Sequence, residues 1–382
     1  MKKILFIGLS WVFLTTSIYV LLFVNNFWGL FLAFVFYFLF KSCTTQHGFQ
    51  FKETFKRLVQ NKWGTVLLIL TFIFTAYLST LLRVRSNIQY AFSNQGVLIV
   101  PSNHQFQLLD DGLKTLDLEV LHQNDEVVIS QLSFTRMNQS INERIKDKFI
   151  AKKLFIFEFN MKNEFGLCAD VENDCQPMNC MEAKNRSNSN FVLNTSFYGL
   201  DSKGLNEIII DKKNYGGRNA TATGFFKVID GKPFAGPKSI FTSNKGTISH
   251  SCQAFPSVMK DGIIFNYIES EIPPSKVSWK MKTYRNLIGT KANGNLVCIV
   301  SNEGGLISVK EISQIAKIYG VEHATLFDGG SALQYSFDDG DWSCTFSAIA
   351  NDGYVPGFIK RILSKRAKST IPARSPVYLY VK

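Results

Sequence analysis

The chain contains 382 residues, which is enough for more than one domain. Hydrophobic residues make up 46% of it, including 34 Phe, and this excess is concentrated in the first 82 residues. The formal net charge of +12 is shared equally between that segment and the rest of the chain. Because Lys and Arg do not cluster with interleaved aromatic residues, this charge argues against a nucleic-acid partner. It is compatible with anionic substrates or an anionic lipid surface.

Three uncharged segments near the N-terminus predict membrane spans, at residues 4–24, 27–40 and 65–82. The first has 21 residues and the third 18, whereas a helix needs about 20 to cross a bilayer. The second has only 14, so two spans remain an alternative to three. A cleavable signal peptide is the other interpretation of the first segment, but no cleavage site of the A-x-A type follows it.

The positive residues around these segments predict their orientation. Lys2 and Lys3 precede the first segment, and five Lys or Arg against one Glu lie between the second and the third. Both positions are therefore expected on the cytoplasmic side. An odd number of spans then places residues 83–382 outside the cytoplasm, in a periplasm, at a cell surface or in a lumen. A lipid bilayer is accordingly one of the expected partners.

The cysteine pattern fits an oxidising compartment. Six of the seven cysteines follow the last predicted span, and an even number there predicts disulfides. Cys168, Cys175 and Cys180 lie in one polar stretch and are the best candidates for a bridge, although six cysteines permit 15 pairings. Cys298 lies within an apolar strand and is expected as a buried thiol. No C-x-x-C occurs, which argues against a zinc ribbon.

The residues after the predicted spans divide into two zones. Residues 83–177 form a strand-rich N-terminal part, and residues 178–382 carry the motifs. Short apolar runs between polar turns are typical of antiparallel strands. Such runs occur at 97–100, 116–121, 127–132 and 154–159 in the first zone, and at 191–193, 207–210, 224–229, 263–267 and 296–300 in the second.

A β-α-β crossover is predicted over residues 296–331. Ser308 and Glu311 form an S-x-x-E capping box where a helix begins. An apolar face at helical spacing follows, and Gly320 stands where that helix ends. The next apolar run is long enough only for a strand, and it is followed by D-G-G-S at 328–331. Polar groups at the C-terminal end of a crossover strand are typical of a functional site.

Four polar groups in the second zone are candidates for a site, and each has a simpler alternative. Asn194 ends an apolar strand before aromatic residues such as Phe197, which suits a sugar but also a turn over core aromatics. Gln253 precedes a hairpin, and a plain strand is the simpler interpretation. Arg285 is either a surface Arg or a guanidinium that holds a phosphate with two parallel hydrogen bonds. Asp328 and its two glycines form either a site open to a ligand or an Asp-Gly turn.

Together these groups resemble the motifs of the phosphodiester glycosidase family, in the same order. The family motifs N-G-G-F-F, Q-x-x-P, R-T-A-I-G and L-D-G-G-G-S correspond here to residues 194–198, 253–256, 285–289 and 327–331. The resemblance extends over about residues 178–382. We therefore expect an α+β fold, in which a mixed β-sheet catalytic domain with few helices is preceded by three N-terminal transmembrane helices.

The resemblance implies hydrolysis of a sugar-1-phosphodiester. It assigns Arg285 to the departing phosphate, and Asp328 to stabilising the oxocarbenium-like centre or activating water. Asn194 would hold sugar hydroxyls or an acetamido group, and the N–H groups of Gly329 and Gly330 would cradle phosphate oxygens. The full set of expected substrate-binding residues is Asn194, Gln253, Phe197, Gly329, Gly330 and Ser331.

The chain departs from the family pattern at two places. Thr195 and Ser196 replace the two glycines after the Asn, which restricts the backbone there. One glycine is missing after Asp328, so either Ser331 or Ala332 takes the family's serine position. The second catalytic carboxylate stays open among Asp201, Glu207, Asp230 and Glu303. No cofactor is expected; a divalent cation near Asp328 stays open, although no metal-loop spacing is recognisable.

The expected function is a membrane-anchored, extracytoplasmic hydrolase of sugar-1-phosphodiesters that acts on cell-envelope or exported glycans. One alternative is a non-catalytic module that binds polysaccharide or sugar phosphate for envelope glycan assembly or export. Another is a membrane anchor with a degenerate domain. The sequence does not indicate the sugar, the aglycone, the oligomeric state, or whether a C–O or a P–O bond breaks.

Overall fold

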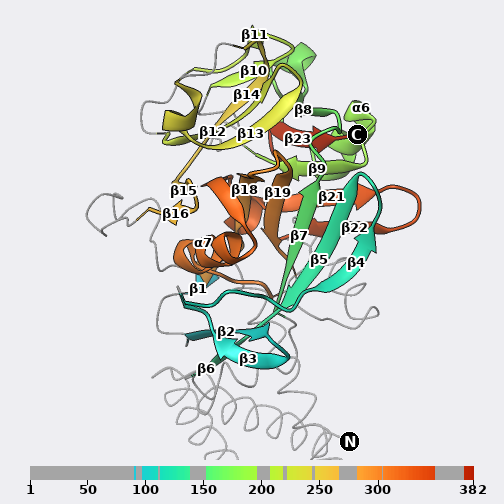
Figure 1. Ribbon diagram of the computed structural model, residues 1–382. Coiled ribbons are helices and arrows are strands. Elements are labelled where there is room, and N and C mark those ends of the chain that lie inside the picture. The colour runs from blue at the N-terminus through green and yellow to red at the C-terminus, as the bar shows by residue number, and fades with distance from the viewer. Residues whose placement is uncertain are drawn as a thin grey trace, which may run out of the picture. The chain divides into compact units, whose positions relative to one another are not determined.

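Strands are the main secondary structure of the described residues in the computed structural model (Figure 1). The structure describes residues 90–91, 97–110, 112–137, 152–195, 207–217, 222–242, 246–265, 282–302, 304–348 and 374–382. They belong to one compact unit, formed by residues 87–138 and 149–382. The helices within these ranges are α6 (Cys180–Ser187), α7 (Val309–Ile318) and the short 3-10 helices η1 (Val171–Asn173), η2 (Lys238–Phe241) and η3 (Gly330–Ala332).

The largest sheet has eight strands, and neighbouring strands in it pair antiparallel. Both predicted zones contribute to it, because its last three strands come from the first zone. In order across the sheet, the strands are β16 (Ile263–Ile264), β15 (Ser257–Lys260), β20 (Val321–Leu326), β18 (Asn286–Lys291), β19 (Leu296–Ser301), β7 (Lys153–Phe159), β5 (Val127–Ser133) and β4 (Glu119–Gln123).

The predicted β-α-β crossover is confirmed as β19–α7–β20. β18 lies between β19 and β20 and is antiparallel to both, so the two outer strands run parallel to each other. The Glu311 N–H donates to Ser308 Oγ at 3.2 Å, and the Ser308 N–H donates to Glu311 Oε2 at 2.8 Å, which completes the predicted capping box. Gly320 follows the helix with a φ of +86°, a left-handed conformation that suits glycine.

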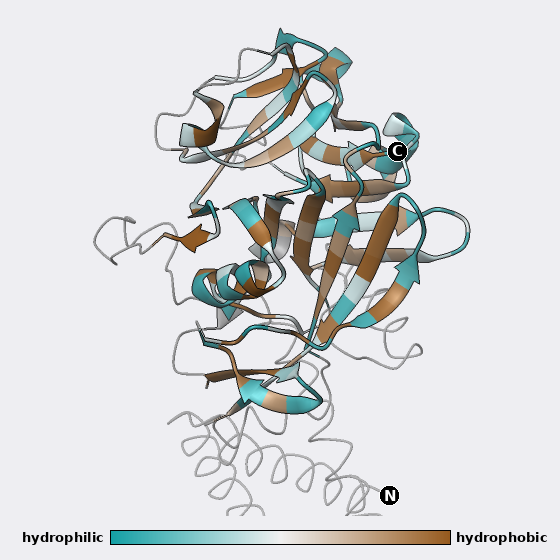
Figure 2. Ribbon diagram, viewed as in Figure 1, coloured by the Kyte–Doolittle hydropathy of each residue, from teal (hydrophilic) through white to brown (hydrophobic). Residues whose placement is uncertain are grey.

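α7 covers one face of the eight-stranded sheet. Its apolar side is buried in a cluster to which alternate strand residues contribute, and these include Leu154 and Ile156 of β7, Leu287 of β18, and Val297 and Ile299 of β19. Successive strand residues point to opposite faces, so Phe155, Phe157 and Phe159 face away from α7. Figure 2 shows the hydrophobic residues that run along these strands.

The other face of this sheet packs against a five-stranded sheet. The ring centroid of Phe157 lies 4.9 Å from that of Phe191 and 5.7 Å from that of Tyr335, so the two sheets share an aromatic core. α6 packs on the opposite face of the second sheet, in a cluster with Val192 and Tyr378. The strands of this sheet are, in order, β22 (Ser343–Ser347), β21 (Gln334–Asp338), β9 (Phe191–Asn194), β23 (Val377–Val381) and β8 (Phe165–Ala169).

The remaining strands form three smaller sheets. One has five strands in the order β11 (Lys213–Asn214), β10 (Ile208–Ile210), β14 (Ile248–Ala254), β12 (Gly224–Ile229) and β13 (Lys232–Pro237). Another has the order β3 (Gln105–Leu108), β2 (Val97–Ser102) and β6 (Thr135–Met137). The last pairs β1 (Tyr90–Ala91) with β17 (Lys282–Thr283).

The described part of the fold is mainly β, which corrects the predicted α+β class. In the part of the chain that the structure describes, no helix combines the length and the apolar character needed to cross a membrane. The two α-helices have 8 and 10 residues, and such helices are only about 12–15 Å long against a hydrocarbon core of about 30 Å. The predicted spans at 4–24, 27–40 and 65–82 lie outside the described residues. No described helix therefore supports the predicted multi-pass membrane protein with its extracytoplasmic domain.

The predicted disulfides are also wrong for the described cysteines, which are all free thiols. Cys168 lies in β8 and Cys180 at the start of α6, where both side chains pack into the apolar cluster beneath that helix. Burial raises the pKa of each of these two thiols to about 11. Proximity in the sequence was therefore a poor guide to disulfide bonding, because the Cys168 and Cys180 sulfur atoms pack as small hydrophobic groups. Cys298 is a fully buried thiol, as predicted.

Candidate active site

Three segments that lie far apart in the sequence meet where several strands end. They are Asn194–Thr195 at the end of β9, Tyr284–Asn286 at the start of β18, and Phe327–Gly330 after β20. β18 and β20 pair antiparallel, so the start of β18 lies beside the end of β20. β9 belongs to the sheet that packs against them. The loop after the crossover strand is therefore surrounded by backbone from both sheets.

Hydrogen bonds fix the backbone of this loop on both sides. The bonds are Phe327 N–H to Asn286 O at 2.8 Å, Asp328 N–H to Thr195 O at 3.0 Å, Gly330 N–H to Tyr284 O at 2.8 Å, and Asn194 Nδ2 to Asp328 O at 2.9 Å. Gly329 permits this close approach, because a Cβ there would collide with the Tyr284 carbonyl oxygen. Gly330 has a φ of +61°, which glycine adopts without strain.

The Asn194 side chain takes part in this arrangement and is fully buried. Its Nδ2 donates to the Asp328 carbonyl oxygen, and its Oδ1 accepts from the Gln334 N–H at 3.0 Å. Its own carbonyl oxygen accepts a hydrogen bond from Asn286 Nδ2 at 2.8 Å. The structure thus brings together Asn194 and Asp328, two of the predicted site residues, through the backbone of Asp328.

Asn286 belongs to this site although no role was predicted for it. It is fully buried, and because it alternates with the core residue Leu287 its side chain lies on the face that meets β9. Its Oδ1 is buried without a hydrogen-bond partner. The sequence feature that could have indicated a role for Asn286 is its position, directly after Arg285 at the start of a strand.

Arg285 is 7% exposed, and its side chain lies beside the segment that precedes α7. Its Nε donates to the Ile307 carbonyl oxygen at 3.4 Å, and its backbone N–H donates to Ser301 Oγ at 2.8 Å. Its Cα lies against Gly329. Among the ion pairs of the described residues, none joins Arg285 to Asp328. The two residues are therefore close in space through their backbones.

Asp328 has the most perturbed carboxyl group of the site. Burial raises its pKa from 3.8 to about 7, and a hydrogen bond from the Gly329 N–H opposes this only in part. The side chain is half-buried and keeps some access to solvent. A carboxyl group in this state both holds and releases a proton near neutral pH, which is what general acid–base chemistry requires.

A protein family matches the region of the chain that contains these three segments. Residues 187–352 match the phosphodiester glycosidase family. The matched region covers less than half of the chain and contains Asn194, Gln253, Arg285 and Asp328. The resemblance inferred from the four motifs is thus confirmed. The family's description, phosphodiester glycosidase, refers to hydrolases of phosphodiester-linked sugars.

Solved structures add more distant likenesses. The catalytic domain of zebrafish N-acetylglucosamine-1-phosphodiester alpha-N-acetylglucosaminidase, auto-inhibited by its pro-peptide, is 11% identical with a TM-score of 0.48, over 69% of this chain and 87% of that one. A hypothetical protein from Synechocystis is 10% identical with a TM-score of 0.46, over 77% of this chain and 68% of that one. No curated protein matches the chain.

The structure gives other partners to several groups that the glycosidase resemblance assigned to the substrate. The Gly329 N–H donates to the Asp328 carboxyl and the Gly330 N–H to Tyr284 O. Gln253 is 1% exposed in β14, and its Oε1 accepts from the Glu207 N–H at 2.8 Å. Phe197 lies outside the described residues, as does the side chain of Ser331.

The hairpin alternative for the Q-x-x-P segment is confirmed. β15 and β16 pair antiparallel after it, and the turn residues Asp261 and Gly262 have φ values of +51° and +70°. Such a pair of positive φ values is typical of a two-residue hairpin turn. The segment therefore leads into the β15–β16 hairpin, and Gln253 lies in β14, the strand before that hairpin.

No second carboxylate joins Asp328 within the described residues. Glu207 contacts Gln253 through its backbone, and Asp230 Oδ1 accepts from the Thr247 N–H at 2.9 Å. The other two candidates, Asp201 and Glu303, lie outside the described residues. Within the part of the chain that the structure describes, no group of three or more His, Cys, Asp or Glu is placed to hold a metal ion.

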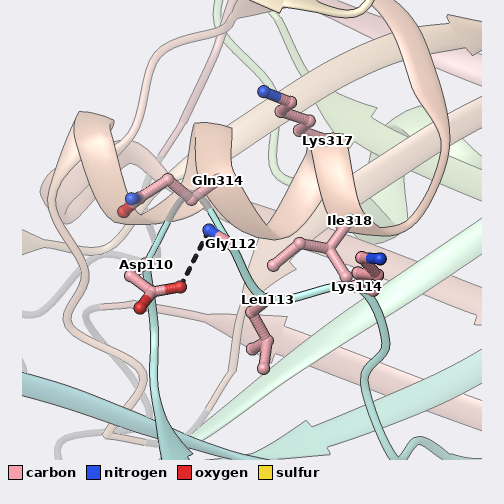
Figure 3. A pocket seen from close by; sticks show the side chains of 7 residues that line it. All are labelled: Asp110, Gly112, Leu113, Lys114, Gln314, Lys317 and Ile318. Atoms are coloured by element: carbon pink, nitrogen blue, oxygen red, sulfur yellow. Dashed lines mark hydrogen bonds between the residues drawn. The ribbon is translucent and has the colours of Figure 1, made fainter.

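A groove of about 370 Å³ lies elsewhere, against α7 (Figure 3). Its lining residues are Asp110, Gly112, Leu113, Lys114, Gln314, Lys317 and Ile318. The Asp110 carboxylate accepts from the Gly112 N–H at 2.9 Å, which shapes the loop on one side of the groove. None of the residues predicted for the glycosidase site lines it.

Proposed function

We propose that the protein hydrolyses a sugar-1-phosphodiester and that Asp328 and Arg285 are its catalytic residues. The observation that supports this most is a carboxyl group with a pKa of about 7, at the end of a crossover strand within the region that matches the glycosidase family. A structural Asp in a turn would be solvated and would keep its ordinary pKa. Perturbed carboxyl groups are concentrated at functional sites.

The proposed reaction breaks the bond between C1 of the sugar and the phosphate oxygen. The phosphate monoester leaves with the bonding electrons, and the oxygen of a water molecule bonds to C1. Ionised Asp328 accepts the proton of that water. Phosphate is a good leaving group, so that a second carboxylic acid is less needed than in ordinary glycosidases.

In this proposal, Arg285 binds the phosphate group of the substrate. Its guanidinium carries a fixed positive charge and can donate two parallel hydrogen bonds to phosphate oxygens. The Nε bond to Ile307 O and the burial of the side chain restrict the orientations of the guanidinium before substrate arrives. A pre-oriented cation stabilises the charge that develops on the departing phosphate.

The test is turnover by the full chain with UDP-N-acetylglucosamine as a sugar-1-phosphate diester. We expect free sugar from the wild type and none from Asp328→Asn, whereas Asp338→Asn, which alters an exposed carboxylate, keeps the activity. In water enriched in oxygen-18, C–O cleavage leaves the phosphate unlabelled. Label in the phosphate would instead require P–O cleavage.

A non-catalytic sugar-binding module is the second candidate. It is favoured by the protein acceptors that both glycine N–H groups already have. It predicts a rise in melting temperature with the sugar phosphate but no release of sugar. Turnover abolished by Asp328→Asn would rule it out, and the absence of both turnover and a thermal shift would contradict both candidates.

A further inference from the structure

The hydrogen bonds around Asp328 form a closed circuit through three strand ends. Phe327 N–H donates to Asn286 O, Asn286 Nδ2 donates to Asn194 O, and Asn194 Nδ2 donates to Asp328 O. Asp328 follows Phe327 directly, which closes the circuit. The donor–acceptor distances of 2.8, 2.8 and 2.9 Å are those of well-formed hydrogen bonds.

We propose that Asn194 is a positioning residue that holds the backbone of Asp328 in place at the end of β20, and that Asn286 holds Asn194. This inference rests on the proposed function, but it gives Asn194 a different task from the sugar contact that the sequence suggested. Its amide is fully buried, and both of its polar atoms have protein partners. An amide in this state is not presented to a ligand.

The carbonyl and the N–H of Asp328 are both held by the end of β9. Asn194 Nδ2 donates to the carbonyl, and Thr195 O accepts from the N–H at 3.0 Å. The peptide units on both sides of Asp328 therefore cannot rotate toward solvent without breaking buried hydrogen bonds. Buried polar groups left without partners are destabilising, so the backbone that carries the carboxyl group stays in this position.

Asn286 strengthens this arrangement from the neighbouring strand. Its side chain donates to Asn194 O while its backbone accepts from Phe327, so one residue fixes both ends of the contact between β9 and the loop. Its Oδ1 remains without a partner in a buried position. Retaining a polar side chain there is unfavourable unless the bond to Asn194 is needed.

The experiment measures the titration of Asp328 through stability, which requires no substrate. The difference in unfolding free energy between the full chain and its Asp328→Asn variant is followed by urea denaturation from pH 4 to pH 9. The same pair is then compared in an Asn194→Ser background. Loss of the positioning bond should let the carboxyl move further into water. The midpoint, which is the pH at which half of the change in this free-energy difference has occurred, should then fall by roughly one pH unit or more.

Asn286→Ala is the second variant, because it removes a single hydrogen bond and is expected to fold if Asn194→Ser does not. It should move the midpoint in the same direction by a smaller amount. Asn124→Ala is the control: it removes hydrogen bonds to the Glu126 and Val127 N–H groups, away from the site, and should lower stability without moving the midpoint.

A midpoint that stays at its wild-type value in both the Asn194→Ser and Asn286→Ala backgrounds, with stability lowered equally at every pH, would overturn the positioning role. If the midpoint shifts but the wild type releases no sugar from UDP-N-acetylglucosamine, the positioning role stands and the proposed function fails. The two outcomes are therefore separable.

Discussion

Burial gives the Asp328 carboxyl group its raised pKa. A carboxyl group paired with an Arg or Lys normally has a lowered pKa, as Glu311 shows beside Arg136 despite its burial. Asp328 receives a hydrogen bond from the Gly329 N–H, which lowers its pKa too little to offset burial. The residue therefore destabilises the folded protein whenever it is ionised, which is a common property of catalytic groups.

Replacing Asp328 by Asn should stabilise the protein, and the gain should grow with pH. The folded pKa of about 7 lies above the 3.8 of an unburied Asp, so the native state binds more protons between these values and stability falls as pH rises through that window. The difference corresponds to at most about 4 kcal/mol, and less because the side chain keeps some access to water. Urea unfolding at pH 4, 6 and 8 should show little gain at pH 4 and the largest at pH 8.

Asp338 provides a control of opposite sign. Its pKa is lowered, chiefly by a hydrogen bond from Lys184, so ionisation of this carboxyl is favourable in the folded state and Asp338→Asn should not stabilise the protein at pH 8. Parallel pH profiles for the wild type and Asp328→Asn would show that Asp328 titrates as an ordinary carboxyl group.

Replacing Arg285 by Lys should reduce kcat/KM by roughly 100-fold, because an ammonium group cannot form two parallel hydrogen bonds to a phosphate. The substitution also removes the Nε donor to Ile307 O, which restricts the side chain. Steady-state kinetics with UDP-N-acetylglucosamine measures the effect. Arg374→Lys, at an exposed ion pair with Glu182, is the matched control and should keep wild-type rates.

At the scale of elements, α7 and the strands around it follow local rules and could be predicted. Its capping box, its apolar spacing and Gly320 are all readable within residues 308–320. α6 was missed because only Cys180 and Ala183 are buried in it, which leaves no apolar periodicity. Its Asn179–Glu182 capping box was nevertheless present in the sequence.

The site was only partly predictable, for a different reason. The D-G-G turn after β20 follows from its own residues, but the bond between Asn194 and Asp328 spans 134 positions. Its existence depends on the pairing of β18 with β20 and on the packing of β9 against them. The sequence motifs contain both residues of this bond, but they suggested for Asn194 a sugar contact that its burial does not favour.

The start of α7 should be held more strongly by its ion pair than by its cap. Glu311 accepts two hydrogen bonds from Arg136, whose side chain is only 4% exposed. Glu311→Gln leaves this buried guanidinium without a counter-charge and should destabilise the protein by about 3–5 kcal/mol, whereas Ser308→Ala should remove about 1 kcal/mol. Urea unfolding at pH 7 compares the two.

Acid should abolish most of the difference between these variants. The pKa of Glu311 is lowered in the folded state, its burial being outweighed by hydrogen bonds and charge from Arg136. Its stabilising effect is therefore present above the unfolded pKa of 4.5 and is lost as pH falls through the lower folded value. Equal losses for Glu311→Gln at pH 7 and in strong acid would contradict the ion-pair explanation.

At the scale of the whole described unit, the two large sheets depend on each other. Phe157 and Phe159 of the eight-stranded sheet contact Phe191 of the five-stranded sheet, at 4.9 Å between ring centroids in both cases. The same packing brings the end of β9 beside the loop that carries Asp328. Stability of the aromatic core and geometry of the site are thus properties of one interface.

Phe157→Ala should therefore destabilise both sheets together. The side chain is fully buried among aromatic rings, so its removal leaves a cavity and should lower the unfolding free energy by about 3–5 kcal/mol. Phe106→Ala is the matched control: that ring is 67% exposed, and its loss should change stability by no more than about 0.5 kcal/mol. Trp fluorescence, to which Trp342 near Phe337 contributes as one of five Trp residues, and far-ultraviolet circular dichroism should give coincident urea transitions for both variants. Separate transitions in Phe157→Ala would mean that the sheets fold independently and that the aromatic interface does not join them into one cooperative unit.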